Sequence, residues 1–308
     1  MNLAALVAHC AARLDEAQVA FGHGTTNAHD EAAWLVLWRL GLPLDTDIDA
    51  ADAVVPDAQA IATVIALIDE RIRTRKPAAY LTRQAWLQGW SFYVDERVIV
   101  PRSLIAEVLV DGSLDYFVGD SPARVLDICT GNGSLAIIAA HVYPDARVLG
   151  SDISTDALAV AHINVAQHVL QERVQLVASD GLAAHELYAG GPFDLILCNP
   201  PYVNAQSMAA LPAEFLAEPA LALDGNRDGS SDGMDFVRAL LPQLATRMTD
   251  NAALVLEIGH ERAYFEAAFP TLPCLWLSTS AGEDQVVLIQ RSALASLSGP
   301  LQGPTPLT

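Results

Sequence analysis

The chain has 308 residues, of which 52% are hydrophobic and 6% aromatic, so it holds enough apolar material for about two domains and is not a disordered protein. No apolar run reaches the ~18 residues of a membrane helix, and four widely spaced cysteines favour reduced thiols in a cytoplasmic protein without a bound metal. Its 37 acidic residues outnumber 17 basic ones, and this net charge of −20 is unsuited to binding nucleic acid unless basic residues gather locally.

The first hundred residues are predicted to form helices followed by a connector. Apolar residues recur at helical spacing in 2–20, 29–40 and 58–73, and Asp57 is placed to cap the third helix. Residues 75–101 are rich in aromatic and β-branched side chains, which predicts a hairpin-like connector. We therefore expect a helical, substrate-recruiting domain over residues 1–110 that includes this connector, with a further helix over 103–117.

Basic residues gather once, between Arg71 and Arg102, where seven of them stand against two acidic residues. This leaves 10 of the 17 basic and 35 of the 37 acidic residues to the rest of the chain, a net of −25. An acidic surface serves either solubility or the binding of a basic partner, and the composition does not separate the two.

Strands and helices alternate after Pro122, a pattern typical of a parallel sheet with helices on both faces. The predicted strands are 124–127, 147–152, 173–178, 193–198, 252–258, 272–278 and 284–290. The last two are too close for a crossover helix, so they must pair antiparallel in a mixed seven-stranded sheet. We expect this α/β domain to span residues 111–291 and a disordered tail to follow over 292–308.

Polar residues stand at the ends of four successive predicted strands, at Asp127, Asp152, Asp180 and Asn199. Ligands of open α/β sheets bind outside the carboxyl ends of the strands, close to the point where the strand order reverses. Four polar residues in the same position favour a ligand site over isolated polar caps.

The loop after the first of these strands contains Gly131 and Gly133, which let the backbone approach a ligand and turn into a helix. Asp152 follows Gly131 by 21 residues, the spacing of a carboxylate that meets a ribose. Carboxylates beside a diphosphate would repel it, whereas they attract the sulfonium and ammonium groups of S-adenosyl-L-methionine. We therefore expect this cofactor rather than NAD, with Asp152 at the ribose and Asp180 near the adenine amino group.

The segment Asn199-Pro200-Pro201-Tyr202 is the predicted catalytic elbow. A planar nitrogen that attacks a methyl group must have both hydrogens held so that its lone pair faces the donor. The Asn199 side chain and the Pro200 carbonyl can accept these hydrogens, Pro201 stiffens the loop, and Tyr202 can stack on the flat substrate group. Together with the upstream loop, the segment favours methyl transfer to a planar nitrogen over an ordinary strand exit.

On these residues the sequence resembles the class I methyltransferases that carry an Asn-Pro-Pro-Tyr motif. It is similar to the glutamine-methylating branch over nearly its full length, including the stretch from Phe92 to Ser103, Glu218-Pro219 and Glu257-Ile258-Gly259. Val-Pro-Arg-Ser at 100–103 looks like the enzymes that act on the third large-subunit ribosomal protein, whereas enzymes that act on release factors usually carry Ile-Pro-Arg-Pro.

The resemblance implies a Rossmann-like methyltransferase that moves a methyl group from S-adenosyl-L-methionine to the side-chain amide of a glutamine, leaving S-adenosyl-L-homocysteine. The expected substrate is a basic large-subunit ribosomal protein, with release factors, and then the amino groups of DNA, as alternatives. We expect no metal, no membrane and no specific nucleic acid. The expected cofactor-binding residues are Asp127, Cys129, Thr130, Gly131, Asn132, Gly133, Asp152, Ile153, Asp180, Gly181 and Asn199.

Overall fold

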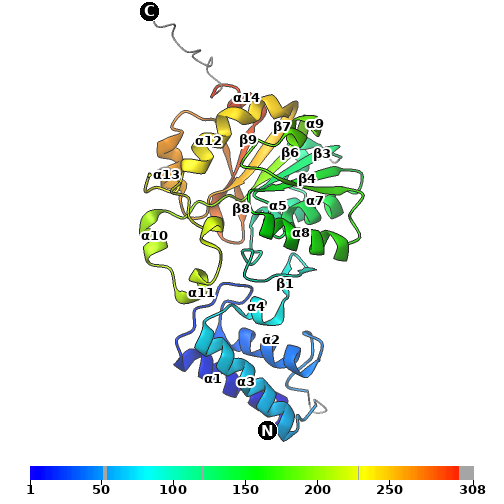
Figure 1. Ribbon diagram of the computed structural model, residues 1–308, viewed down its shortest axis with the longest axis vertical. Helices are drawn as coiled ribbons and strands as arrows, with labels where there is room; N and C mark the ends of the chain where they lie inside the picture. The colour runs from blue at the N-terminus through cyan, green and yellow to red at the C-terminus, as the bar shows by residue number, and fades with distance from the viewer. Residues whose placement is uncertain (51–53, 120, 228, 298–308) are drawn as a thin grey trace, which may run out of the picture.

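The computed structural model describes residues 1–50, 54–119, 121–227 and 229–297. Helices gather at one end of the molecule, a seven-stranded sheet with flanking helices forms the other, and a short connector lies between them (Figure 1). The helical end consists of α1 (Leu3–Glu16), α2 (Ala28–Leu40), α3 (Ala58–Thr74) and α4 (Ala78–Thr82).

Side-chain caps fix where the three long helices begin. Asn2 and Asn27 accept hydrogen bonds from backbone N–H groups three residues on, each at 2.9 Å. Asp57 accepts from Ala60 N–H at 2.7 Å, so its predicted capping role is confirmed. The apolar faces pack together into one core, which includes Leu6, Leu35 and Ile68.

The connector contains a two-stranded antiparallel hairpin, as predicted, formed by β1 (Ala85–Leu87) and β2 (Trp90–Phe92). Its two tryptophans serve different cores. Trp86 packs edge-on against Trp34 of α2, with ring centroids 5.6 Å apart, whereas Trp90 stacks on His141 beside the sheet.

The large sheet is mixed and has the order β5-β4-β3-β6-β7-β9-β8. Its strands are β3 (Arg124–Ile128), β4 (Arg147–Asp152), β5 (Val174–Ala178), β6 (Phe193–Cys198), β7 (Met248–Glu257), β8 (Leu275–Thr279) and β9 (Gly282–Gln290). Strands β3 to β7 run parallel, while β9 pairs antiparallel with both β7 and β8. The predicted fold class is therefore confirmed, including the closing hairpin.

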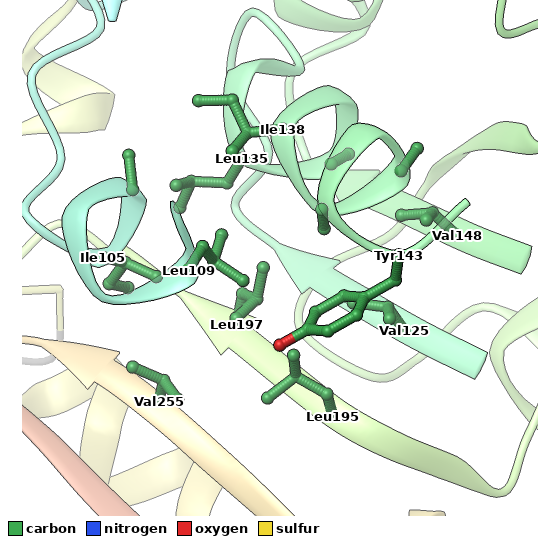
Figure 2. Packing of buried hydrophobic residues seen from close by; sticks show 14 of the residues in the cluster. Ile105, Leu109, Val125, Leu135, Ile138, Tyr143, Val148, Leu195, Leu197 and Val255 are labelled. Atoms are coloured by element: carbon green, nitrogen blue, oxygen red, sulfur yellow. The ribbon is translucent and has the colours of Figure 1, made fainter. Parts of the chain in front are cut away.

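Helices cover both faces of the sheet. Apolar side chains from α5 (Ile105–Val110), α7 (Ser134–Val142) and α8 (Thr155–Gln167) belong to the core of one face. Figure 2 shows Ile105 and Leu109 of α5 beside Leu135 of α7 and Leu197 of the sheet. The core of the other face receives side chains from α9 (His185–Ala189), α12 (Asp235–Leu244), α13 (Arg262–Ala268) and α14 (Arg291–Leu294).

The structure differs from two predictions of secondary structure. The single helix predicted over 103–117 is instead two short ones, α5 and α6 (Asp115–Val118), because Gly112 between them has a φ of +77°, which no helix interior allows. The predicted tail begins in α14, where Leu294 is fully buried, while 298–308 lie outside the described residues. Within the described ranges, no helix has the length and apolarity needed to span a membrane.

Candidate active site

The predicted elbow and the predicted cofactor loop lie side by side at the carboxyl edge of the sheet. Ile128, the last residue of β3, pairs in register with Cys198, the last residue of β6. From β3 the chain goes to β4 and β5 on one side and returns to β6 on the other, so this is the point where the strand order reverses. The position is the usual ligand site of open α/β sheets.

The cofactor loop is a strained turn. Cys129 has a φ of +60°, which is uncommon for a residue with a side chain, and Gly131 and Gly133 have φ values of +57° and +82°. A Cβ atom on Gly133 would lie 3.2 Å from Ala161 Cβ, so the close packing of α7 on α8 favours glycine there. Such strain persists where the surrounding structure holds it, often at functional sites.

Asp127 supports this loop from beneath and does not line the cavity. It is fully buried, and its Oδ2 accepts hydrogen bonds from Thr130 Oγ1 at 2.5 Å and from Ala136 N–H at 3.1 Å. Its Oδ1 has no hydrogen-bond partner among the described residues. Burial raises the pKa of Asp127 to about 7, although the two hydrogen bonds oppose this shift.

The carboxylates of Asp152 and Asp180 lie in different environments. Asp152 lines the cavity, and its two oxygens accept from the N–H groups of Gly131 at 2.9 Å and Ser154 at 2.8 Å. Burial raises the pKa of Asp152 despite these bonds. Asp180 has a largely exposed side chain that pairs with Arg227 at 3.3 Å, and it lies outside the cavity lining.

A cavity of about 260 Å³ joins most of the predicted site residues. The residues that share it are Cys129, Thr130, Gly131, Asn132, Asp152, Ile153, Asn199, Pro200, Pro201 and Tyr202. Gly133 and Gly181, like Asp127 and Asp180, are not among the residues that line it. The elbow and the cofactor loop therefore open into one space.

Glycines crowd around Tyr202 and fix the course of the elbow. A Cβ atom on Gly259 would lie 2.6 Å from Tyr202 Cε2, and one on Gly233 would lie 2.0 Å from the Tyr202 carbonyl oxygen. Burial and the nearby Glu257 carboxylate raise the pKa of Tyr202, which keeps its hydroxyl neutral. The Asn199 side chain, only partly buried, makes no hydrogen bond with any described residue and is available to a ligand.

Comparison with known proteins identifies the family. The chain is 49% identical to the ribosomal protein uL3 glutamine methyltransferase of Burkholderia pseudomallei, over 96% of each chain. It is also 49% identical to the Bordetella pertussis protein of that name, over 94% of this chain and 95% of the relative. This chain belongs to the uL3 glutamine methyltransferase family. A family profile described as "Methyltransferase small domain" also matches residues 113–228.

A segment that sequence reasoning did not place in the site forms the remaining wall of the cavity. It comprises α10 (Ala205–Ala209), α11 (Ala213–Leu216) and the short 3-10 helix η1 (Ala220–Ala222), which follow the elbow. Leu211, Phe215 and Leu221 from this segment line the cavity together with Arg97 to Ser103 of the connector. No feature of the local sequence marks Phe215 as a site residue, because its ring packs against His23 and Arg102, which are distant in the chain.

Arg102 is held in place by the buried carboxylate of Glu218. This carboxylate accepts hydrogen bonds from Arg102 Nη1 and Nη2 at 2.7 and 2.8 Å and from Val100 N–H at 2.8 Å. His23 Nε2 lies 3.4 Å from the second oxygen. Although burial opposes ionisation, the nearby His23 and the hydrogen bonds from Arg102 lower the pKa of Glu218 to about 2.

Internal carboxylates neutralise most of the basic stretch between Arg71 and Arg102. Arg71 pairs with Glu31 at 2.8 Å, and Arg75 pairs with Glu214 of α11 at 3.2 Å. The other ion pairs of this stretch are Lys76–Glu96, Arg83–Asp95, Arg97–Asp95 and Arg102–Glu218. Two of these pairs, Arg75–Glu214 and Arg102–Glu218, join the stretch to α11 and the residues that follow it, and most of the local positive charge is paired within the described part of the chain.

Glu257, at the end of β7, acts as a cap. Its Oε2 accepts from Ser103 Oγ at 2.5 Å and from Leu104 N–H at 3.0 Å, just before α5 begins. Burial raises the pKa of Glu257 to about 7, against the effect of these bonds. These contacts fix the Glu257 carboxylate at the start of α5.

Proposed function

We propose that this chain transfers a methyl group from S-adenosyl-L-methionine to the side-chain amide nitrogen of a glutamine in ribosomal protein uL3. Membership of a family whose relatives carry that name supports the substrate. The single observation that supports the chemistry is the shared cavity, in which the elbow at 199–202 faces the loop at 129–132. The expected roles of 1–110 as a substrate-recruiting domain and of 111–291 as the transferase domain follow from this proposal.

The chain's own groups fit S-adenosyl-L-methionine, which supplies an electrophilic methyl group on a sulfonium. Asp152 presents a carboxylate at the distance along the chain expected for a ribose contact. Asn132 lines the cavity and its Nδ2 has no partner among the described residues, so a donor is available there. The backbone of 129–131 supplies further polar groups for the amino-acid end.

The elbow orients the glutamine amide. Asn199 Oδ1 accepts one amide hydrogen and the Pro200 carbonyl accepts the other, which turns the nitrogen lone pair toward the methyl carbon. The Tyr202 ring packs against the amide plane. As the nitrogen–carbon bond forms, the bond from sulfur to the methyl carbon would break, and S-adenosyl-L-homocysteine would leave as a neutral thioether. The amide nitrogen, which then carries a positive charge and is strongly acidic, loses a proton to water or to a nearby carbonyl, so the proposal needs no dedicated base.

The charge pattern supports a basic protein as partner. A net of −25 outside residues 71–102 attracts a basic substrate. The internal ion pairs of Arg71 to Arg102 argue against DNA, which would require an open basic face. A cytoplasmic location suits this substrate and the unpaired cysteines.

The decisive experiment incubates the purified enzyme and labelled S-adenosyl-L-methionine separately with purified uL3 and with purified release factors. We expect label on uL3 alone, mapped by peptide mass spectrometry to one glutamine side chain. Label on a release factor alone, or on any residue type other than glutamine, would refute the proposal.

A further inference from the structure

A second cavity, of about 190 Å³, lies where the helical domain meets the connector. Its lining is largely apolar and aromatic, with two indole rings set edge to face. The residues that form these apolar walls are Trp34, Leu44, Ala85, Trp86, Val100 and Pro101. Pockets that bind organic groups have this character, with a few polar groups that fix orientation.

Three buried polar atoms of the lining residues make no hydrogen bond with the described part of the chain. They are Trp34 Nε1, His23 Nδ1 and His23 Nε2. An indole N–H can only donate, so Trp34 requires an acceptor. His23 Nε2 faces the Glu218 carboxylate, and a proton on that nitrogen leaves Nδ1 as an acceptor. Buried polar groups without partners are rare and point to a missing ligand or water.

The second cavity adjoins the reaction cavity. Val100 and Pro101 line both, so only this stretch of the connector separates them. The position of that stretch is fixed, because Val100 N–H donates to Glu218 and Tyr80 Oη donates to the Val98 carbonyl. A polypeptide that presents its glutamine to Asn199 therefore has neighbouring residues near the second cavity.

We propose that the second cavity is a substrate subsite, which takes the apolar side chain of a residue flanking the methylated glutamine. The Trp34 indole N–H donates to a main-chain carbonyl of the same segment, and the side chain fills the space between Trp34 and Trp86. This inference rests on the proposed function, since it assumes that a protein segment occupies the reaction cavity. It assigns the helical domain a direct part in choosing the sequence around the glutamine.

The test is a set of double-mutant cycles between enzyme and substrate. Each residue flanking the modified glutamine of uL3 is changed to alanine, and KM and kcat are measured with wild-type enzyme, Trp34→Phe and Ala85→Leu. Trp34→Phe removes the donor and keeps most of the ring, whereas Ala85→Leu fills the cavity. Trp90→Phe, which changes a tryptophan on the other side of the connector, is the matched control.

With the wild-type enzyme we expect one apolar substrate position at which alanine raises KM about tenfold with little change in kcat. With Trp34→Phe or Ala85→Leu the same substitution should raise KM less than threefold, while the KM for S-adenosyl-L-methionine stays unchanged. Trp90→Phe should retain the tenfold effect. If either variant is unfolded by circular dichroism, the other carries the test.

Additive effects at every position would overturn the subsite and leave ordered water as the occupant of the cavity. A wild-type enzyme that does not methylate uL3 would instead refute the proposed function, so the two failures are distinguishable. Tryptophan fluorescence gives a second readout: unmethylated uL3 should change the emission of the wild type and change that of Trp34→Phe less.

Discussion

Arg102 and Glu218 lie 116 residues apart in the chain and meet in a two-pronged ion pair, at 2.7 and 2.8 Å, beneath the reaction cavity. The guanidinium also lies 5.5 Å from the Phe215 ring centre, and the other neighbour of that ring is His23, at 4.3 Å between centroids. Residues from the helical domain, the connector and the segment after the elbow thus converge on one carboxylate. The shape of the cavity depends on this convergence.

Replacing Glu218 by glutamine should destabilise the fold by about 3 kcal/mol, because it leaves Arg102 without its buried carboxylate. The measurement is urea unfolding at pH 7. Asp232→Asn, which breaks the surface pair with Arg238, is the control and should cost less than about 1 kcal/mol. Equal effects of the two variants would contradict the importance of burial.

The contribution of the Glu218 carboxylate to the stability of the fold should depend on pH. The pKa of Glu218 in the folded protein is about 2, below the ordinary value of 4.5. A lowered carboxylate pKa stabilises the fold fully above pH 4.5, and this contribution is lost as the pH falls toward 2. Glu218→Gln should therefore destabilise equally at pH 7 and pH 5.5, and the gap from wild type should narrow below pH 4.

Asp127 and Glu257 should make the stability of the fold depend on pH in the opposite direction. Their pKa values in the folded protein are about 7, above the ordinary 3.8 and 4.5, so the fold binds protons that the unfolded chain releases. Stability should fall as the pH rises from about 4.5 to 7, by at most about 1.4 kcal/mol per pH unit for each group. Urea unfolding of Asp127→Asn and Glu257→Gln should show a flatter profile across this range; an unchanged slope would count against the raised pKa values.

Asn199→Ala should lower turnover by ~10² or more, because the variant loses a contact that orients the reacting amide. Affinity for S-adenosyl-L-methionine, measured by calorimetry, should stay within about twofold of wild type. Turnover close to wild type would remove Asn199 from the mechanism. A large loss of cofactor affinity would move its role from the substrate to the cofactor.

Gly259→Ala should impair both stability and turnover, since its φ is +53° and the new Cβ would lie 2.6 Å from Tyr202 Cε2. Gly41→Ala isolates the backbone effect, because Gly41 has a φ of +67° and nothing within 4 Å of the added atom. We expect Gly41→Ala to cost about 1–2 kcal/mol without lowering turnover. Gly259→Ala should cost more, and kcat should fall because the Tyr202 ring is displaced. Similar kinetics for both variants would contradict the role of crowding.

The sheet and the position of the site were predictable from local patterns. Alternating strands and helices set the parallel core, and the short link at 280–283 required the closing antiparallel pair. Asp152 and Asn199 reach one cavity because the carboxyl ends of parallel strands meet at one edge. The same reasoning could not foresee that Asp127 and Asp180 do not line the cavity, because a strand-end position does not determine which way a side chain turns.

The cavity wall formed by residues 205–222 could not be predicted from the sequence. The resemblance drew attention to Glu218, but the chain offers no local sign that Arg102 would meet both this carboxylate and the Phe215 ring. The pair between Arg75 and Glu214 spans 139 residues. Such contacts depend on the packing of whole domains, which periodicity and spacing do not encode.

The ion pairs that join α11 to the helical domain also bear on how this architecture is inherited. A methyltransferase core that acquired a different N-terminal domain would bury Glu214 and Glu218 without the arginine and histidine side chains that now contact them. The segment at 205–222 and the helical domain must therefore change in concert during divergence, and grafting one onto a foreign core without the other should give an insoluble chimera.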